Sequence, residues 1–61
     1  MNNRLLVIDD NLITRTILAG LFKAEYDVVQ ASNGLEGMNY LLAAPTSYCA
    51  ILLDLNMPIM D

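Results

Sequence analysis

The sequence contains no histidine and a single cysteine, Cys49, so two common ways of stabilising a small domain are missing. One cysteine cannot close an internal disulfide, and a structural zinc site needs several Cys or His ligands. A chain of 61 residues removes only about 60% of its surface from water on folding. Because 56% of the residues are hydrophobic and only 16% are charged, the composition is typical of a piece of a larger core, or of a subunit that buries surface against a partner.

Basic residues are also scarce. Arg4, Arg15 and Lys23 are the three basic residues, and the formal net charge is −4. They form no cluster that could neutralise phosphates, which argues against nucleic-acid binding by this segment. The first apolar run, Leu5 to Ile8, ends at two acids and is too short for a signal peptide or a membrane span. We therefore expect a cytoplasmic protein without a membrane partner, in which Cys49 stays reduced.

Two alternative families, one that binds dinucleotides and one of phosphatases, fit the residues directly after this first run less well. A dinucleotide-binding fold would have G-x-G-x-x-G there, and the chain has Asp9, Asp10 and Asn11. A phosphatase of the haloacid dehalogenase type would show a D-x-D pair, whereas these two acids are adjacent.

Three short runs predict β-strands. Leu5 to Ile8 and Tyr48 to Leu53 are continuously apolar, which is expected of strands covered on both faces. Asp27 to Ala31 is centred on two β-branched valines, which favours a strand.

The apolar spacing between the first two runs predicts an amphipathic helix from about Leu12 to Ala24. Its expected buried stripe consists of Ile13, Ile17 and Leu21, widened by Leu18 and Phe22. Gly20 within it costs about 1 kcal/mol relative to alanine. This cost is tolerated more easily if another backbone packs closely at that position.

A second helix is predicted to begin near Gly34. Asn33 followed three residues later by Glu36 resembles a capping box, with Asn in place of the usual Ser or Thr. Pro45 ends the helix. The expected buried face consists of Leu35, Met38, Leu41 and Leu42.

The resulting order is β-α-β-α-β, which implies an α/β fold with a parallel sheet and right-handed crossovers. The residues themselves do not give the strand order. The order 2-1-3 would put the first strand in the middle and the two helices on opposite faces. It would also bring Asp9, Asp10 and Asp54 to the carboxyl ends of neighbouring strands, where such sheets bind ligands.

Three carboxylates held together repel one another, so the arrangement makes sense mainly if a cation lies among them. Mg²⁺ is the natural choice because it prefers hard oxygen ligands and is commonly held by one or two carboxylates. A carboxylate such as Asp54 can also act as a nucleophile toward phosphorus. Two plainer interpretations stay open: Asp9 and Asp10 fit a solvated helix start equally well, and Asn56 fits a turn ahead of Pro58.

The Asp9-Asp10 pair after the first strand, together with D-L-N-M-P-I-M-D at residues 54–61, resembles the receiver domain of bacterial two-component response regulators. The resemblance implies a flavodoxin-like doubly wound parallel sheet with strand order 2-1-3. It implies that Asp54 is the phospho-acceptor, that Asp10 ligates Mg²⁺ directly, that Asp9 acts largely through water, and that Asn56 contributes its backbone carbonyl.

The resemblance covers residues 1–61, which correspond to about the first half of a receiver: three strands and two helices. The family usually continues with a Ser/Thr at the end of a fourth strand and a Lys at the end of a fifth. We expect a truncated receiver domain that is a regulatory module rather than an enzyme, since self-phosphorylation needs the second half. In the intact parent, the resemblance implies a histidine kinase or phosphotransfer protein as phosphoryl donor.

An alternative is an isolated half-domain with a structural role. The third strand would then be an unpaired edge, and the segment from Ala50 to Leu55 is apolar enough to favour association. Pairing two copies through this strand would give a homodimer that at most binds Mg²⁺ without phosphotransfer.

Overall fold

The computed structural model describes residues 3–54 of the chain. The elements in chain order are β1 (Arg4–Ile8), α1 (Leu12–Phe22), β2 (Asp27–Ala31), α2 (Gly34–Ala43) and β3 (Tyr48–Leu53). The predicted β-α-β-α-β order is therefore confirmed. Neither described helix has the length and apolar character needed to cross a membrane.

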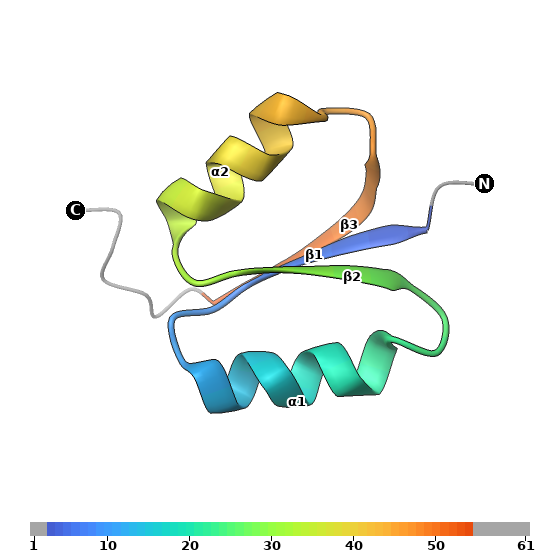
Figure 1. The fold of residues 1–61 in the computed structure, drawn as a ribbon, viewed down its shortest axis with the longest axis vertical. Coiled ribbons are helices and arrows are strands. Elements are labelled where there is room, and N and C mark those ends of the chain that lie inside the picture. Colours follow the sequence, from blue (N-terminus) through green and yellow to red (C-terminus); the bar gives the residue numbers. More distant parts are fainter. Residues whose placement is uncertain (1–2, 55–61) are drawn as a thin grey trace.

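The three strands form one parallel sheet in the order β2-β1-β3, with β1 in the middle. Helices α1 and α2 lie on opposite faces of this sheet, as Figure 1 shows. This arrangement confirms the expected strand order. The described residues thus form an α/β unit that matches part of a flavodoxin-like doubly wound sheet.

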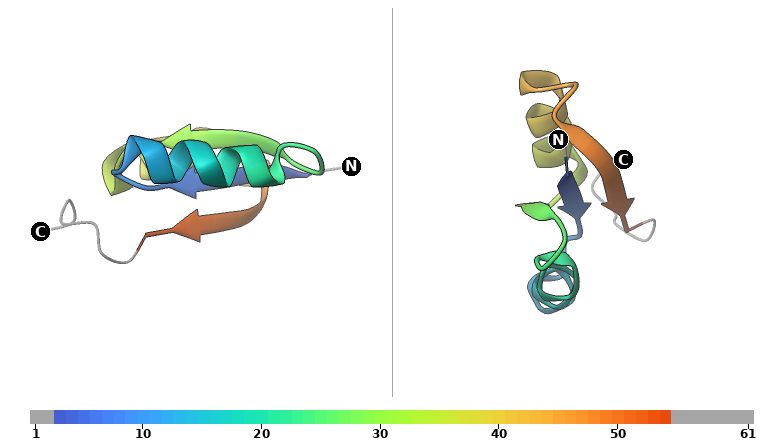
Figure 2. Two further views of the ribbon diagram at one scale, coloured as in Figure 1. Left: turned by 90° about the horizontal axis from the view of Figure 1, so that it is seen from below. Right: turned by 90° about the vertical axis from the view of Figure 1, so that its right-hand side faces the viewer.

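The core lies around β1. Its four apolar residues, from Leu5 to Ile8, are all buried, as expected for a central strand with a neighbour on each side. Strand β3 is different, because Ile51 and Leu53 are 46% and 51% exposed. The expectation that β3 is covered on both faces is wrong for the described residues, since β3 lies at the edge of the sheet (Figure 2).

Helix α1 packs on β1 and β2 with only part of the predicted face, in which Leu18 and Phe22 are half-buried. Ala19 is its buried residue, whereas Ile13 is 72% exposed and Ile17 and Leu21 are also exposed. The buried position of this helix is thus taken by the small side chain of Ala19. The helix ends at Phe22 rather than Ala24.

Gly20 does not have the close neighbour that was expected. Outside its own helix, no atom of the described chain lies within 4 Å of the position that a Cβ would occupy. The glycine therefore allows no close backbone approach, and its cost in helix propensity is not offset there.

The predicted start of α2 is confirmed. The Asn33 side chain caps the helix by accepting a hydrogen bond from the Glu36 backbone N–H at 2.8 Å. The Glu36 carboxylate accepts from the backbone N–H of Ser32, one residue before the position in a standard capping box. The helix ends at Ala43, just before Pro45, as a proline requires.

The buried face of α2 is formed by Gly34 and Gly37 rather than by large side chains. Of the four apolar residues expected to be buried, only Leu41 is partly buried and packs against the core. The other three, Leu35, Met38 and Leu42, are exposed. A Cβ on Gly37 would overlap the Ile8 side chain, so the absence of a side chain lets α2 lie directly on β1.

Candidate metal centre

The register of the sheet places Asp9 and Asp54 beside each other, at the ends of β1 and β3. Ile8 and Leu53 are partners at the end of the β1–β3 ladder, and the Asp54 N–H continues it by donating to the Ile8 carbonyl at 3.0 Å. On the other side of β1, the Asp9 N–H donates to the Ala31 carbonyl at 3.1 Å. Both acids therefore have fixed backbones at the carboxyl edge of the sheet.

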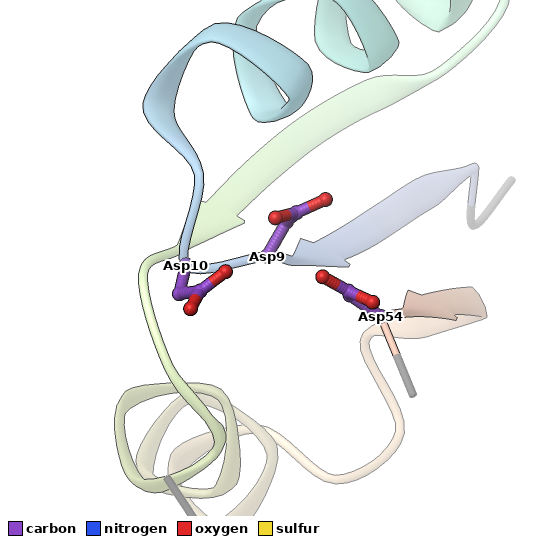
Figure 3. A group of neighbouring side chains, drawn as sticks. All are labelled: Asp9, Asp10 and Asp54. Carbon is purple, nitrogen blue, oxygen red and sulfur yellow. The ribbon is translucent and has the colours of Figure 1, made fainter. Parts of the chain in front are cut away.

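Asp9, Asp10 and Asp54 form one group of carboxylates (Figure 3). One oxygen from each lies within 4.8 Å of the others. Asp9 is only 5% exposed, Asp54 is half-buried and Asp10 is exposed. The structure therefore brings together the three acids that were expected at the ends of the strands. Their exposure to solvent increases from Asp9 to Asp54 to Asp10.

The donor set fits a hard divalent cation. Ligand oxygens placed about 2.1 Å from Mg²⁺ in an octahedron are separated by about 3.0 Å when adjacent and by about 4.2 Å when opposite. The 4.8 Å limit on the observed spacings is slightly wider than this range, so small side-chain rotations would bring the oxygens to coordination distance. Asp9, Asp10 and Asp54 would hold the ion.

The Asp9 carboxylate is held in place by the loop that follows it. Its Oδ1 accepts a hydrogen bond from the Asn11 N–H at 2.9 Å. Asn11 in turn caps α1, because its Oδ1 accepts from the Thr14 N–H at 3.0 Å. The start of α1 and the orientation of Asp9 are therefore fixed by the same short segment.

Two residues at this site were missed by the sequence analysis. Asn11 directly before an apolar helical pattern is a typical N-cap, so its residue type could have indicated the role. Arg15 donates from Nη1 to the Asp9 carbonyl at 2.8 Å. No local pattern predicts this contact, because it depends on how α1 lies against β1.

A hollow of about 290 Å³ adjoins the carboxylates. Its lining consists of Ile8, Asp9, Leu18, Leu52, Leu53 and Asp54. The walls are mostly apolar, so electrostatic interactions at the carboxylates are screened less than in bulk water.

The remaining predicted ligand, Asn56, lies outside the described residues, as does the turn considered ahead of Pro58. The acidic group at 9, 10 and 54 is consequently the part of the predicted site that can be described.

The chain is similar over its full length to the protein named Transcriptional regulatory protein SrrA of Staphylococcus aureus. The identity is 40% over 62 residues for the sequences from strains NCTC 8325 / PS 47, COL and MSSA476, covering 100% of this chain and 25% of each relative. The chain thus spans about a quarter of the length of the curated relatives it matches. No protein-family model matches the chain, and no solved structure matches it significantly.

Proposed function

We propose that this chain is part of the receiver domain of a response regulator and that it accepts a phosphoryl group on Asp54; its similarity to a transcriptional regulatory protein and its strand order β2-β1-β3 support the proposal. The observation that carries the proposal is the group formed by Asp9, Asp10 and Asp54 at the carboxyl ends of two adjacent strands. Ligands of open parallel sheets bind at this edge. The partly exposed Asp54 is accessible to a donor, whereas Asp9 is buried and fixed.

The proposed reaction is a phosphoryl transfer from a phosphohistidine of a histidine kinase or phosphotransfer protein. An Asp54 carboxylate oxygen attacks phosphorus and forms the O–P bond of an aspartyl phosphate. The P–N bond of the donor breaks, and its electron pair returns to the imidazole nitrogen. The chain acts as a cytoplasmic regulatory module in this reaction rather than as an enzyme.

The other acids hold the cation that this reaction needs. We assign direct ligation of Mg²⁺ to Asp10 and Asp54, ligation largely through water to Asp9, and a backbone carbonyl ligand to Asn56. Bound Mg²⁺ supplies positive charge that offsets the negative charge of the transferring phosphoryl group. The hydrogen bond from the Asn11 N–H holds the buried Asp9 carboxylate in place beside the other two acids.

The phosphoryl acceptor is tested on the natural gene product that carries these residues. We expect incubation with Mg²⁺ and a small acyl phosphate to add one phosphoryl group, which borohydride trapping and peptide mass spectrometry locate at Asp54. Asp54→Asn should add none. Asp27→Asn is the matched control, because Asp27 is an exposed acid in β2 that pairs with Arg4 instead. Labelling of another residue, or equal labelling of the Asp54→Asn variant, would contradict the proposal.

The cation is tested on the chain itself by denaturation with and without Mg²⁺. A ligand present at about 100 times its Kd raises the free energy of unfolding by about 2.7 kcal/mol. We expect this stabilisation in the wild type and in Asp27→Asn, and its loss in Asp10→Asn. Unfolding that is independent of Mg²⁺ would remove the cation from the proposal.

A second candidate function is structural association through β3. Among residues 3–54, β3 has a strand neighbour on one side only, and Ile51 and Leu53 on it are half exposed. Pairing the β3 edges of two copies would satisfy the outer backbone groups and cover these side chains, giving a homodimer.

Native mass measured over a range of concentrations tests this association. We expect a dimer that Ile51→Lys dissociates. Ile17→Lys, which places the same charge on an exposed position of α1, should remain dimeric. A wild-type monomer at all concentrations would exclude pairing through β3.

A further inference from the structure

The Arg15 side chain connects three elements next to the acidic group. It lies on α1, and its Nη1 donates to the Asp9 carbonyl at 2.8 Å. Its Nε donates to the Gln30 side-chain oxygen at 3.1 Å. The guanidinium therefore joins the end of β1 to β2 from a position on the covering helix, and the side chain is half-buried.

The Asp9 carbonyl lies between two of the three acids along the chain. It belongs to the peptide group that joins Asp9 to Asp10, and a peptide group is planar. A hydrogen bond that fixes this oxygen therefore fixes the direction in which the chain enters Asp10. The plane places the Asp10 Cα, from which the exposed Asp10 side chain extends.

Two other polar groups of Asp9 are also hydrogen-bonded. The Asp9 N–H is bonded to Ala31, and the Asp9 carboxylate accepts from Asn11. Arg15 supplies the remaining constraint on the backbone of Asp9. Without it, the Asp9 carbonyl would lose its hydrogen bond to α1.

We infer that Arg15 is a positioning residue for the Asp9–Asp10 segment of the acidic group, and that Gln30 orients its guanidinium for this purpose. The inference rests on the proposed function only in so far as the positioned group binds a cation. The bond to a backbone carbonyl is the basis of this role: Arg15 sets the geometry of the acids through the main chain.

Substitution of Arg15 separates positioning from simple electrostatics, because the two effects have opposite signs. Removing a positive charge close to a cation site strengthens cation binding. Releasing the Asp9–Asp10 peptide weakens it, because the ligand oxygens must then be ordered by the ion. The loss of a hydrogen bond from a charged donor corresponds to about a tenfold weakening.

The first measurement needs no metal. Amide hydrogen exchange is followed at Asn11, whose N–H bonds to the Asp9 carboxylate. We expect Arg15→Gln to speed exchange at Asn11 by about tenfold, while Leu6 and Val7 in the centre of β1 keep their protection. Unchanged exchange at Asn11 would overturn the inference. So would an equal loss of protection throughout β1, which is the result expected of a purely structural residue.

The second measurement is the Mg²⁺ affinity of the same variants. We expect Arg15→Gln to weaken it about tenfold, against the direction that charge removal alone predicts. Lys23→Gln removes one positive charge from the residue that caps the other end of α1 and should leave the affinity unchanged or slightly higher. Tighter binding by Arg15→Gln would overturn the positioning role.

Gln30→Ala provides an independent variant that keeps the charge of Arg15 and removes only its partner on β2. We expect faster exchange at Asn11 and weaker Mg²⁺ binding, each to a smaller extent than in Arg15→Gln. If both stay unchanged, the role given to Gln30 is overturned. If the wild type binds no Mg²⁺, the proposed function fails, whereas exchange at Asn11 still decides whether Arg15 holds this segment.

Discussion

The contact between α2 and β1 at Gly37 allows a sharp test of the packing. A methyl group added there would overlap Ile8 Cδ1 and lie 2.8 Å from Ile8 Cγ1. Ile8 is buried, so its side chain has little room to move away. Gly37→Ala should therefore push α2 away from the sheet or force Ile8 into a less favourable rotamer.

The expected magnitude combines two opposing effects. Overpacking in a core costs about 1 to 3 kcal/mol, and replacing glycine by alanine within a helix contributes about 1 kcal/mol of stability. Gly37→Ala should thus lower the free energy of unfolding by up to about 2 kcal/mol. Gly20→Ala is the matched control: its methyl group meets no atom outside its own helix within 4 Å, so it should raise stability by about 1 kcal/mol.

Urea denaturation followed by circular dichroism measures both changes. A double-mutant cycle with Ile8→Val, which removes Cδ1, should show that part of the cost of Gly37→Ala is relieved. A gain in stability from Gly37→Ala equal to that from Gly20→Ala would refute the close packing of α2 on β1.

Two further changes test the cap and the core. Asn33→Ala removes the acceptor for the Glu36 N–H and should cost about 1 kcal/mol of stability in a denaturant titration, whereas Asn39→Ala at an exposed position of α2 should not destabilise the chain. Leu6→Ala, at a fully buried position, should lower the free energy of unfolding by about 2 to 5 kcal/mol. Leu42→Ala, at an exposed position, should change it by less than about 0.5 kcal/mol. Similar costs for the two leucines would contradict the assignment of the core.

The strands and the helix starts could be predicted from the sequence because their signals are local. The four-residue apolar run ending at Ile8 and the valine pair in β2 indicated strands, and Asn33 indicated the start of α2. The strand order was implied only by the resemblance to receiver domains, since local patterns carry no information on which strands are neighbours.

The buried faces of the helices could not be predicted in the same way. Apolar spacing predicts which side chains share a stripe, but the packing was decided by Ala19 and Gly37, whose small size permits close approach. Among the predicted residues, Ile13 and Leu42 are exposed. The spacing of apolar residues therefore did not show which positions of each helix meet the sheet.

The candidate site could likewise be predicted only in part. Asp9, Asp10 and Asp54 could be located because each lies just beyond the end of a strand, and parallel strands end at one edge. The contact of Arg15 with the Asp9 carbonyl depends on the rotation of α1 over β1, which no pattern within the helix specifies.

The most direct test of the cation site is a nuclear magnetic resonance titration of the chain with Mg²⁺, following the backbone amides. We predict saturable shifts centred on Asp9, Asp10 and Asp54, and their loss in Asp54→Asn. Shifts that are absent, or that gather at the exposed acids Glu25 and Asp27 at the opposite end of the sheet, would contradict the assignment of these three acids as a cation site.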